Sequence, residues 1–169
     1  MNGIPRPWLV LGIVIAAAAF APLVASGSKD WSDAADCVGV PIVQNCHATA
    51  SMTVSYDPSM TGFGACQSNG CWFHQYCTAG GSGFPSFSNT MTCLPSIGTI
   101  TCGNVIVGSS PPCSQSSDNY HFVDKNTCAS FTATAQGTTF LLVVPLGSTR
   151  IMSTSIVACV DSSGAPSAT

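Results

Sequence analysis

The feature that most constrains this chain is an uninterrupted apolar stretch, Trp8–Ala25, which contains no charge, hydroxyl or side-chain amide. A helix of about 20 residues crosses the hydrocarbon core of a bilayer, so these 18 residues are just long enough to span it. Arg6 precedes the stretch, and the next charge is Lys29. Because positive charge favours the cytoplasmic side, we expect residues 8–25 to export the rest of the chain through the membrane.

Two interpretations of the apolar stretch stay open. Leu9–Phe20 has the length of a signal-peptide core, and Val24-Ala25-Ser26 offers small residues before a cut at Gly27. Alternatively the segment 1–27 is retained as a membrane anchor or filament-core helix, in which Pro22 is tolerated. The side chains expected to pack against neighbouring helices are then Leu9, Val10, Ile13, Val14, Ile15 and Phe20.

Ten cysteines follow the apolar stretch, and an even number beyond an export segment predicts a disulfide framework. Spacing favours local pairs such as Cys37–Cys46 and Cys93–Cys102, while the full connectivity stays open. An oxidising, extracellular or cell-surface location is expected. The cysteines expected to form disulfides are Cys37, Cys46, Cys66, Cys71, Cys77, Cys93, Cys102, Cys113, Cys128 and Cys159.

Charge is unusually sparse in this sequence. Charged residues make up 7% of the chain, where about 25% is ordinary, and all seven acidic residues are Asp. Small and hydroxyl residues fill the polar surface instead, which is typical of surface and filament proteins. With four Lys and Arg residues and a net charge of −3, the composition argues against nucleic-acid binding.

Strand signals dominate the second half of the chain. Residues 47–56 and 127–135 alternate apolar and polar positions, which predicts half-buried strands. Thr138–Pro145 contains a continuous apolar run, as expected of a strand covered on both faces. Together with Arg150–Val160, these segments predict an antiparallel meander that turns at Gly137 and again at residues 146–148. Two shorter strand-like pieces lie within residues 90–107.

Four parts are expected to lack strands. Ser28–Asp36 would extend the first helix or act as a linker, and the Gly-rich residues 59–89 would form a cystine-braced excursion with at most one helical turn. Ser109–Asn119 would be a loop, and the tail Ser162–Thr169 would be loose.

The predicted fold is therefore mainly β: an N-terminal apolar helix followed by a disulfide-braced antiparallel β-sandwich-like domain. The helix covers residues 1–27, the extension or linker covers 28–36, the β domain covers 37–161, and the tail covers 162–169.

No motif in the sequence predicts catalysis. His74 lies between Cys71 and Cys77, which would suit a metal, but cysteines in an oxidising compartment are expected to pair with each other. His121 has Asp118 and Asp124 three residues away on either side, yet the chain has no G-x-S-x-G elbow. We expect no catalytic residue, no metal site and no cofactor.

The leading hypothesis is a non-enzymatic structural subunit of an extracellular or cell-surface assembly, such as a pilus-like filament. Its apolar helix would pack against copies of itself or other surface subunits, with the β domain outside, and sparse charge would weaken the repulsion between copies. An apolar helix followed by a bridged β domain is similar in outline to type IV pilins. The pilin cleavage motif and the Phe and Glu that follow it are absent here.

Two alternatives remain. The chain could be an accessory subunit of a membrane complex, held by residues 8–25. It could instead be a secreted disulfide-rich adhesion or binding module, with exposed aromatic side chains as its recognition surface. The side chains expected on that surface are Phe63, Trp72, Phe73, Tyr76, Phe84 and Phe87.

Overall fold

The computed structural model describes residues 28–38, 46–56, 66–83, 86–95, 98–102, 113–141 and 143–169. None of these ranges contains a helix with the length and apolar character needed to cross a membrane. The predicted N-terminal helix, residues 1–27, lies outside the described residues. So do its expected packing side chains Leu9, Val10, Ile13, Val14, Ile15 and Phe20.

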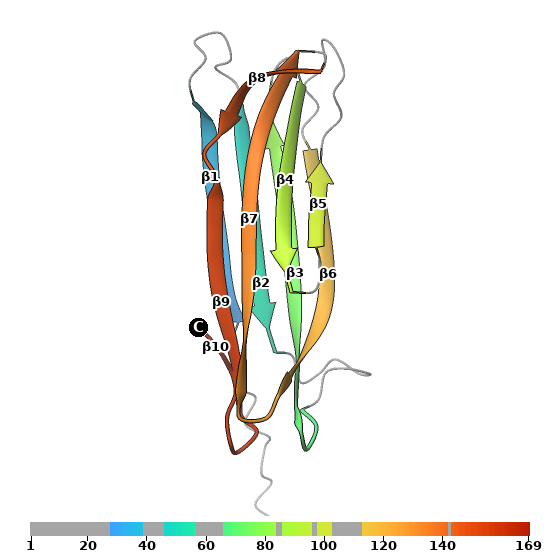
Figure 1. Cartoon of the computed structure of the whole chain (residues 1–169), viewed down its shortest axis with the longest axis vertical. Coiled ribbons are helices and arrows are strands. Elements are labelled where there is room, and N and C mark those ends of the chain that lie inside the picture. Colours follow the sequence, from blue (N-terminus) through green and yellow to red (C-terminus); the bar gives the residue numbers. More distant parts are fainter. Residues whose placement is uncertain are drawn as a thin grey trace, which may run out of the picture.

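The described residues form ten strands, drawn in Figure 1. They are β1 (Ser28–Val38), β2 (His47–Ser55), β3 (Gly70–Ser82), β4 (Ser86–Leu94), β5 (Gly98–Cys102), β6 (Cys113–Asp124), β7 (Thr127–Leu141), β8 (Val144–Thr149), β9 (Met152–Val160) and β10 (Pro166–Ala168). The prediction of a mainly antiparallel β protein is confirmed, because every pairing between these strands is antiparallel.

The strands form a near-barrel, and the expected sandwich is wrong. The hydrogen-bonded order is β10-β9-β7-β8-β1-β2-β3-β6, with β4 pairing to β7 and β5 to β4. The cause is that β1 changes partners along its length. Ser28–Asp36 pair with β2, and the last two residues, Cys37 and Val38, pair with β8, which joins the two sheets. Among the described strands, no pairing joins β5 to β6 or β10 to β1, so hydrogen bonds do not close the ring completely.

The longest strand, β7, runs through the turn expected at Gly137. Its lower part pairs with β9 and its upper part with β8, while β4 pairs along the other side. A Cβ built at Gly137 would lie 2.6 Å from Phe87 Cζ and 2.8 Å from Ala48 Cβ. Glycine at this position therefore leaves room for a core aromatic ring rather than providing a turn.

The first strand replaces the expected helix extension or linker at residues 28–36. Ala35 is buried and Trp31 packs against the core, while Asp30 and Asp36 are exposed. This period of two is that of a strand, with Asp30 and Asp36 on its solvent side. Asp33 shares the side of Trp31 and Ala35 and is partly exposed. The exposed Asp36 Oδ1 lies 2.8 Å from His47 Nδ1 on β2.

Strands β3 and β6 correct two further expectations. Within residues 59–89 the structure describes 13-residue β3 and the start of β4, rather than an irregular excursion with a helical turn. The expected loop Ser109–Asn119 is a strand from Cys113 onwards. It pairs with β3 over the full register from Gly81↔Cys113 to Gly70↔Asp124. Pairing supplies backbone partners to a polar segment that has little apolar periodicity of its own.

A disulfide framework is present, as predicted, and two of its bridges link strands: Cys77–Cys93 joins β3 to β4, and Cys128–Cys159 joins the neighbours β7 and β9. The local pair Cys37–Cys46 is confirmed, whereas Cys93 bonds to Cys77 and not to Cys102. Cys102 is also disulfide-bonded. These bridges are consistent with an extracellular location. The four bridges that the structure describes in full are Cys37–Cys46, Cys66–Cys71, Cys77–Cys93 and Cys128–Cys159.

Two buried amides join opposite sides of the near-barrel: Gln75 on β3, whose Nε2 donates to the Leu94 oxygen on β4 at 3.0 Å, and Asn89 on β4. Asn89 is fully buried. Its Nδ2 donates to the backbone oxygens of Thr49, at 2.9 Å, and Gly80, at 2.8 Å. A single side chain on one side of the core thus binds the backbones of β2 and β3 on the other.

The C-terminal tail is ordered by a tight turn, against the expectation of a loose end. Asp161 Oδ1 accepts hydrogen bonds from the Ser163 hydroxyl at 2.6 Å, the Ser163 amide at 2.7 Å and the Ala165 amide at 2.9 Å. These bonds, with that from the Ser163 side chain foremost, lower the pKa of Asp161. The chain then returns as β10 alongside β9.

Candidate interaction surfaces

The candidate metal residues around His74 are engaged elsewhere. Cys71 is bonded to Cys66 and Cys77 to Cys93, so neither sulfur is a free thiolate. Among the described residues, no group of three or more His, Cys, Asp or Glu side chains could hold a metal ion.

The structure does not bring Asp118 or Asp124 together with His121 as a catalytic triad would require. Residues three apart on a strand point to opposite faces. His121 therefore turns inward, with its ring centroid 5.6 Å from that of Phe131, while Asp118 and Asp124 lie on the exposed side of β6. The spacing that looked suggestive in sequence separates these side chains in the fold.

An aromatic face covers the outer side of β3 and β6. We define it as Trp72, His74 and Tyr76 of β3 with Tyr120 and Phe122 of β6. Alternation along β3 places its three rings on one side, and the register sets Trp72 opposite Phe122 and His74 opposite Tyr120. The Trp72 and Phe122 centroids are 5.2 Å apart in an edge arrangement, and those of His74 and Tyr120 stack at 4.9 Å.

The polar surroundings of the aromatic face are sparse. His74 Nε2 lies 3.7 Å from Asp118 Oδ2, in the same part of the sheet. Tyr76 is 37% exposed, so its ring is open to a ligand. The aromatic rings can stack on an apolar ring face of a ligand, and the neighbouring carboxylate can accept hydrogen bonds from the ligand's hydroxyl groups.

The structure retains only part of the aromatic surface expected from sequence. Trp72 and Tyr76 point outward as expected, but Phe73 and Phe87 are buried in the core. Phe63 and Phe84 lie outside the described residues. Sequence reasoning missed Tyr120 and Phe122 because they come from a segment some 40 residues further along the chain. Only the pairing of β3 with β6 brings them together.

A hydroxyl face covers the outer side of β5, β4, β7 and β9. Register aligns its side chains across the strands, as in the row Thr99, Thr92, Thr134 and Ser153. The Thr92 and Thr99 hydroxyls lie 3.3 Å apart and hydrogen-bond to each other. No outward position described on these four strands carries a charge. The members are Thr90, Thr92, Thr99, Thr101, Ser130, Thr132, Thr134, Ser153 and Ser155.

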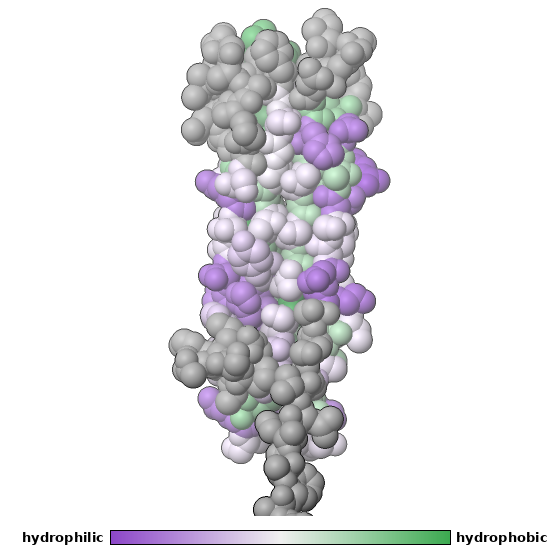
Figure 2. Space-filling view, turned by 180° about the vertical axis from the view of Figure 1, so that it is seen from behind, coloured by the Kyte–Doolittle hydropathy of each residue, from purple (hydrophilic) through white to green (hydrophobic). Residues whose placement is uncertain are grey.

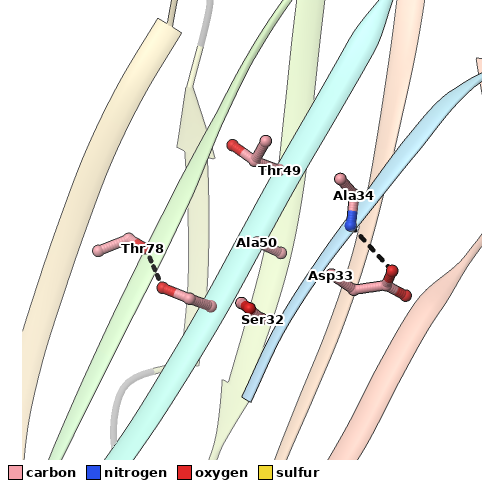
Figure 3. Close-up of a pocket in the computed structure, with 7 residues that line it drawn as sticks. Ser32, Asp33, Ala34, Thr49, Ala50 and Thr78 are labelled. Atoms are coloured by element: carbon pink, nitrogen blue, oxygen red, sulfur yellow. Dashed lines mark hydrogen bonds between the residues drawn. The ribbon is translucent and has the colours of Figure 1, made fainter. Parts of the chain in front are cut away.

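The opposite side, seen in Figure 2, is pale and nearly neutral in hydropathy between separated hydrophilic groups. A shallow hollow of about 500 Å³ lies there over β1, β2 and β3 (Figure 3). Three of its polar side chains, Asp33, Ser51 and Thr78, have partners within the chain. Asp33 Oδ1 accepts from Arg150 Nη2 at 2.9 Å, and the Ser51 and Thr78 hydroxyls bond to each other.

An apolar tip stands at the hairpin between β7 and β8. We define it as Leu141, Val143 and Val144, whose exposed fractions are 46%, 83% and 57%. The continuous apolar run in this segment predicted a strand covered on both faces. The structure instead places it at one end of the molecule, at the top of Figure 1, and leaves it uncovered within the described chain.

These features define a class of protein: a disulfide-braced antiparallel β near-barrel with hydroxyl sides, an aromatic face and an apolar tip. No family model, curated protein or solved structure is similar to the chain. Its function is therefore argued from these surfaces.

Proposed function

We propose that the protein is a non-enzymatic structural subunit of an extracellular or cell-surface assembly. The observation that carries this proposal is the apolar tip. Fully burying a Val or Leu side chain is worth about 1.5–3 kcal/mol, so adjacent aliphatic side chains exposed at one end favour contact with another molecule. The 83% exposure of Val143 is unusual for an aliphatic residue flanked by other aliphatic residues.

The rest of the surface suits close contact between copies. The hydroxyl face has no charge at its described positions, so like-charged groups do not oppose each other when subunits approach. The disulfides stabilise each subunit outside the cell, where assemblies are exposed to mechanical and proteolytic stress. An apolar stretch of 18 residues before the near-barrel offers a second apolar surface.

The proposal is tested on the full chain isolated from its native membrane or culture medium. Sedimentation velocity and negative-stain electron microscopy are expected to show regular oligomers or filaments. A stable monomer at high protein concentration, with or without mild detergent, would refute a structural role. Recovery in a fixed ratio with other membrane proteins would support an accessory subunit of a membrane complex instead.

A binding module is the second candidate, and the aromatic face favours it. The outward-facing rings of β3 and β6 can stack on the apolar faces of sugar rings, and the neighbouring Asp118 can accept hydrogen bonds from sugar hydroxyls. Titration with soluble polysaccharides, followed by tryptophan fluorescence, tests this role. Binding that is lost in Tyr76→Ala and kept in the hydroxyl-face control Thr134→Ala would support it. Absence of binding across neutral and acidic glycans would count against it.

A further inference from the structure

We infer that the apolar tip binds the apolar stretch Trp8–Ala25 of a second copy, so that subunits join head to tail. The inference rests on the proposed structural role and names the contact that would build the assembly. Three properties support it: the position of the tip in the fold, the length of the stretch, and the apolar character of both surfaces.

The tip and the point where the stretch joins the near-barrel are far apart. The described chain begins at Ser28, and β1 rises ten residue steps to Val38, or about 33 Å. Val38 pairs with Ser148, and Ser148 pairs with Thr138, three residues before the tip begins. The tip thus lies about 10 Å beyond the upper end of β1. Figure 1 shows the same arrangement, with the β7–β8 hairpin at the top and the start of β1 far below it.

The stretch of the same copy is poorly placed to cover its own tip. Three residue steps separate Ala25 from Ser28 and reach about 10 Å. As a helix, 18 residues extend about 27 Å. Folded straight back along the near-barrel, the linker and the helix together extend about 37 Å, against the roughly 43 Å between Ser28 and the tip, so only the last side chains of the helix would approach the tip. A membrane holding the stretch of the same copy would lie equally far from the tip. The stretch of the next copy has no such constraint.

The two surfaces match in chemistry. The stretch has no charge, hydroxyl or side-chain amide, and the described tip residues are all aliphatic. Both surfaces gain by leaving water, and neither brings a polar group that would need a partner when buried. By contrast, the hydroxyl face would leave rows of donors and acceptors against an apolar helix.

A contact between two different surfaces has a structural consequence. Such a heterologous contact leaves one tip and one stretch free at the ends of every pair, so it propagates into a ring or an open filament. A tip that contacted the tip of a second copy would close as a dimer instead. The inferred contact therefore predicts a closed ring or an open filament in which each tip binds the stretch of another copy.

The experiment places a photo-crosslinking amino acid, p-benzoylphenylalanine, at Val143 of the full chain and maps its crosslinks by mass spectrometry after proteolysis. Crosslinks between copies are expected in peptides from residues 8–25. Crosslinks confined to a second tip, to the aromatic or hydroxyl face, or to lipid would overturn the inference.

Charge variants measure how much the tip contributes to assembly. Val143→Asp with Val144→Asp is expected to raise the critical concentration for assembly about a hundredfold or more, because both side chains lose their apolar contact and bring charge into it. The matched control Ser114→Asp with Ser116→Asp adds the same charge at exposed positions of β6, outside the tip and the hydroxyl face, and is expected to assemble within about threefold of wild type. An unchanged mass shift on reduction and an unchanged circular dichroism spectrum verify that both variants fold.

The outcomes separate the inference from the function on which it rests. Unchanged assembly of the tip variant would overturn the inference while leaving the structural role intact. An assembled protein whose intact mass begins at Gly27 would do the same, because the proposed occupant would be missing. A wild-type chain that never assembles would overturn both.

Discussion

Changing the buried amide of Asn89 to a carboxylate is expected to cost about 3–5 kcal/mol of unfolding free energy at neutral pH. The side chain is fully buried, and its Nδ2 donates two hydrogen bonds to backbone oxygens on the opposite side of the core. Asn89→Asp keeps the shape but removes both donors, which contributes about 2 kcal/mol. It also sets an uncompensated charge against two carbonyl oxygens, the kind of change that costs several kcal/mol in a protein interior.

The same variant is expected to recover stability in acid. Burial and the neighbouring carbonyl oxygens raise the pKa of the new carboxyl above its unfolded value of about 3.9. Because the carboxyl has a higher pKa in the folded state than in the unfolded state, the variant loses stability as the pH rises from the unfolded-state pKa towards the folded-state pKa. The gap to wild type should therefore narrow on acidification from pH 7 to pH 4, by at most about 1.4 kcal/mol per pH unit.

Urea titrations of the oxidised protein at several pH values measure both effects. Thr90→Asp is the matched control, because Thr90 is the next residue on β4 and is exposed. It adds the same charge on the solvent side and should change the free energy of unfolding by less than about 0.5 kcal/mol. If Asn89→Asp were as stable as this control at pH 7, or if its deficit did not change with pH, the amide would not bridge the two sides of the core as described.

Three further predictions concern the packing at Gly137, the Cys77–Cys93 disulfide and the turn at Asp161. Gly137→Ala should lower the free energy of unfolding by about 1–3 kcal/mol, because the added methyl would lie 2.6 Å from Phe87 Cζ; a change under about 0.5 kcal/mol in urea would contradict this. Replacing the Cys77–Cys93 bridge by two alanines should cost about 3 kcal/mol in thermal unfolding, since it closes a loop of 16 residues, and a variant as stable as wild type would count against this. The pKa of Asp161 is lowered from its ordinary value of 3.8 by hydrogen bonds within its turn, first of all the one from the Ser163 hydroxyl. The stability that Asp161 contributes to the fold is therefore complete above pH 3.8, and it is lost as the pH falls through the lower pKa of the folded state. After correction for the intrinsic exchange rate, the protection of the β10 amides should then fall as the pH drops below 3.8 in wild type, whereas Asp161→Asn should lack this pH dependence.

Alternation of side chains predicted the strands wherever one face is apolar and the other polar. Residues 47–56 show this pattern and form β2, with Ala48, Ala50, Met52 and Val54 all buried. β3 was missed because both of its faces carry aromatic side chains. Phe73 points inward while Trp72 and Tyr76 point outward, so no period of two is visible in sequence.

Polar strands were missed for the opposite reason. The upper part of β6 carries Ser, Gln and Asn on both faces, and β1 carries three Asp, so neither shows a continuous apolar face. Their strand conformation depends on backbone pairing with β3 and β2, which are distant or unrecognised in sequence. Register likewise assembles the aromatic face from two segments, and no local pattern in either one could reveal it.

The misread apolar run of the β7–β8 hairpin is the most informative of these errors. A run of consecutive aliphatic residues indicates a strand that is buried on both faces. Burying these side chains remains favourable when the fold leaves the run exposed to solvent. Within the described residues, no strand covers Val143. The cover must then come from chain outside those residues or from another molecule. The longest apolar segment of the sequence joins the near-barrel about 40 Å away, at Ser28. A subunit can therefore bring few of these side chains to its own tip, and this distance is the feature that would make addition of the next subunit favourable.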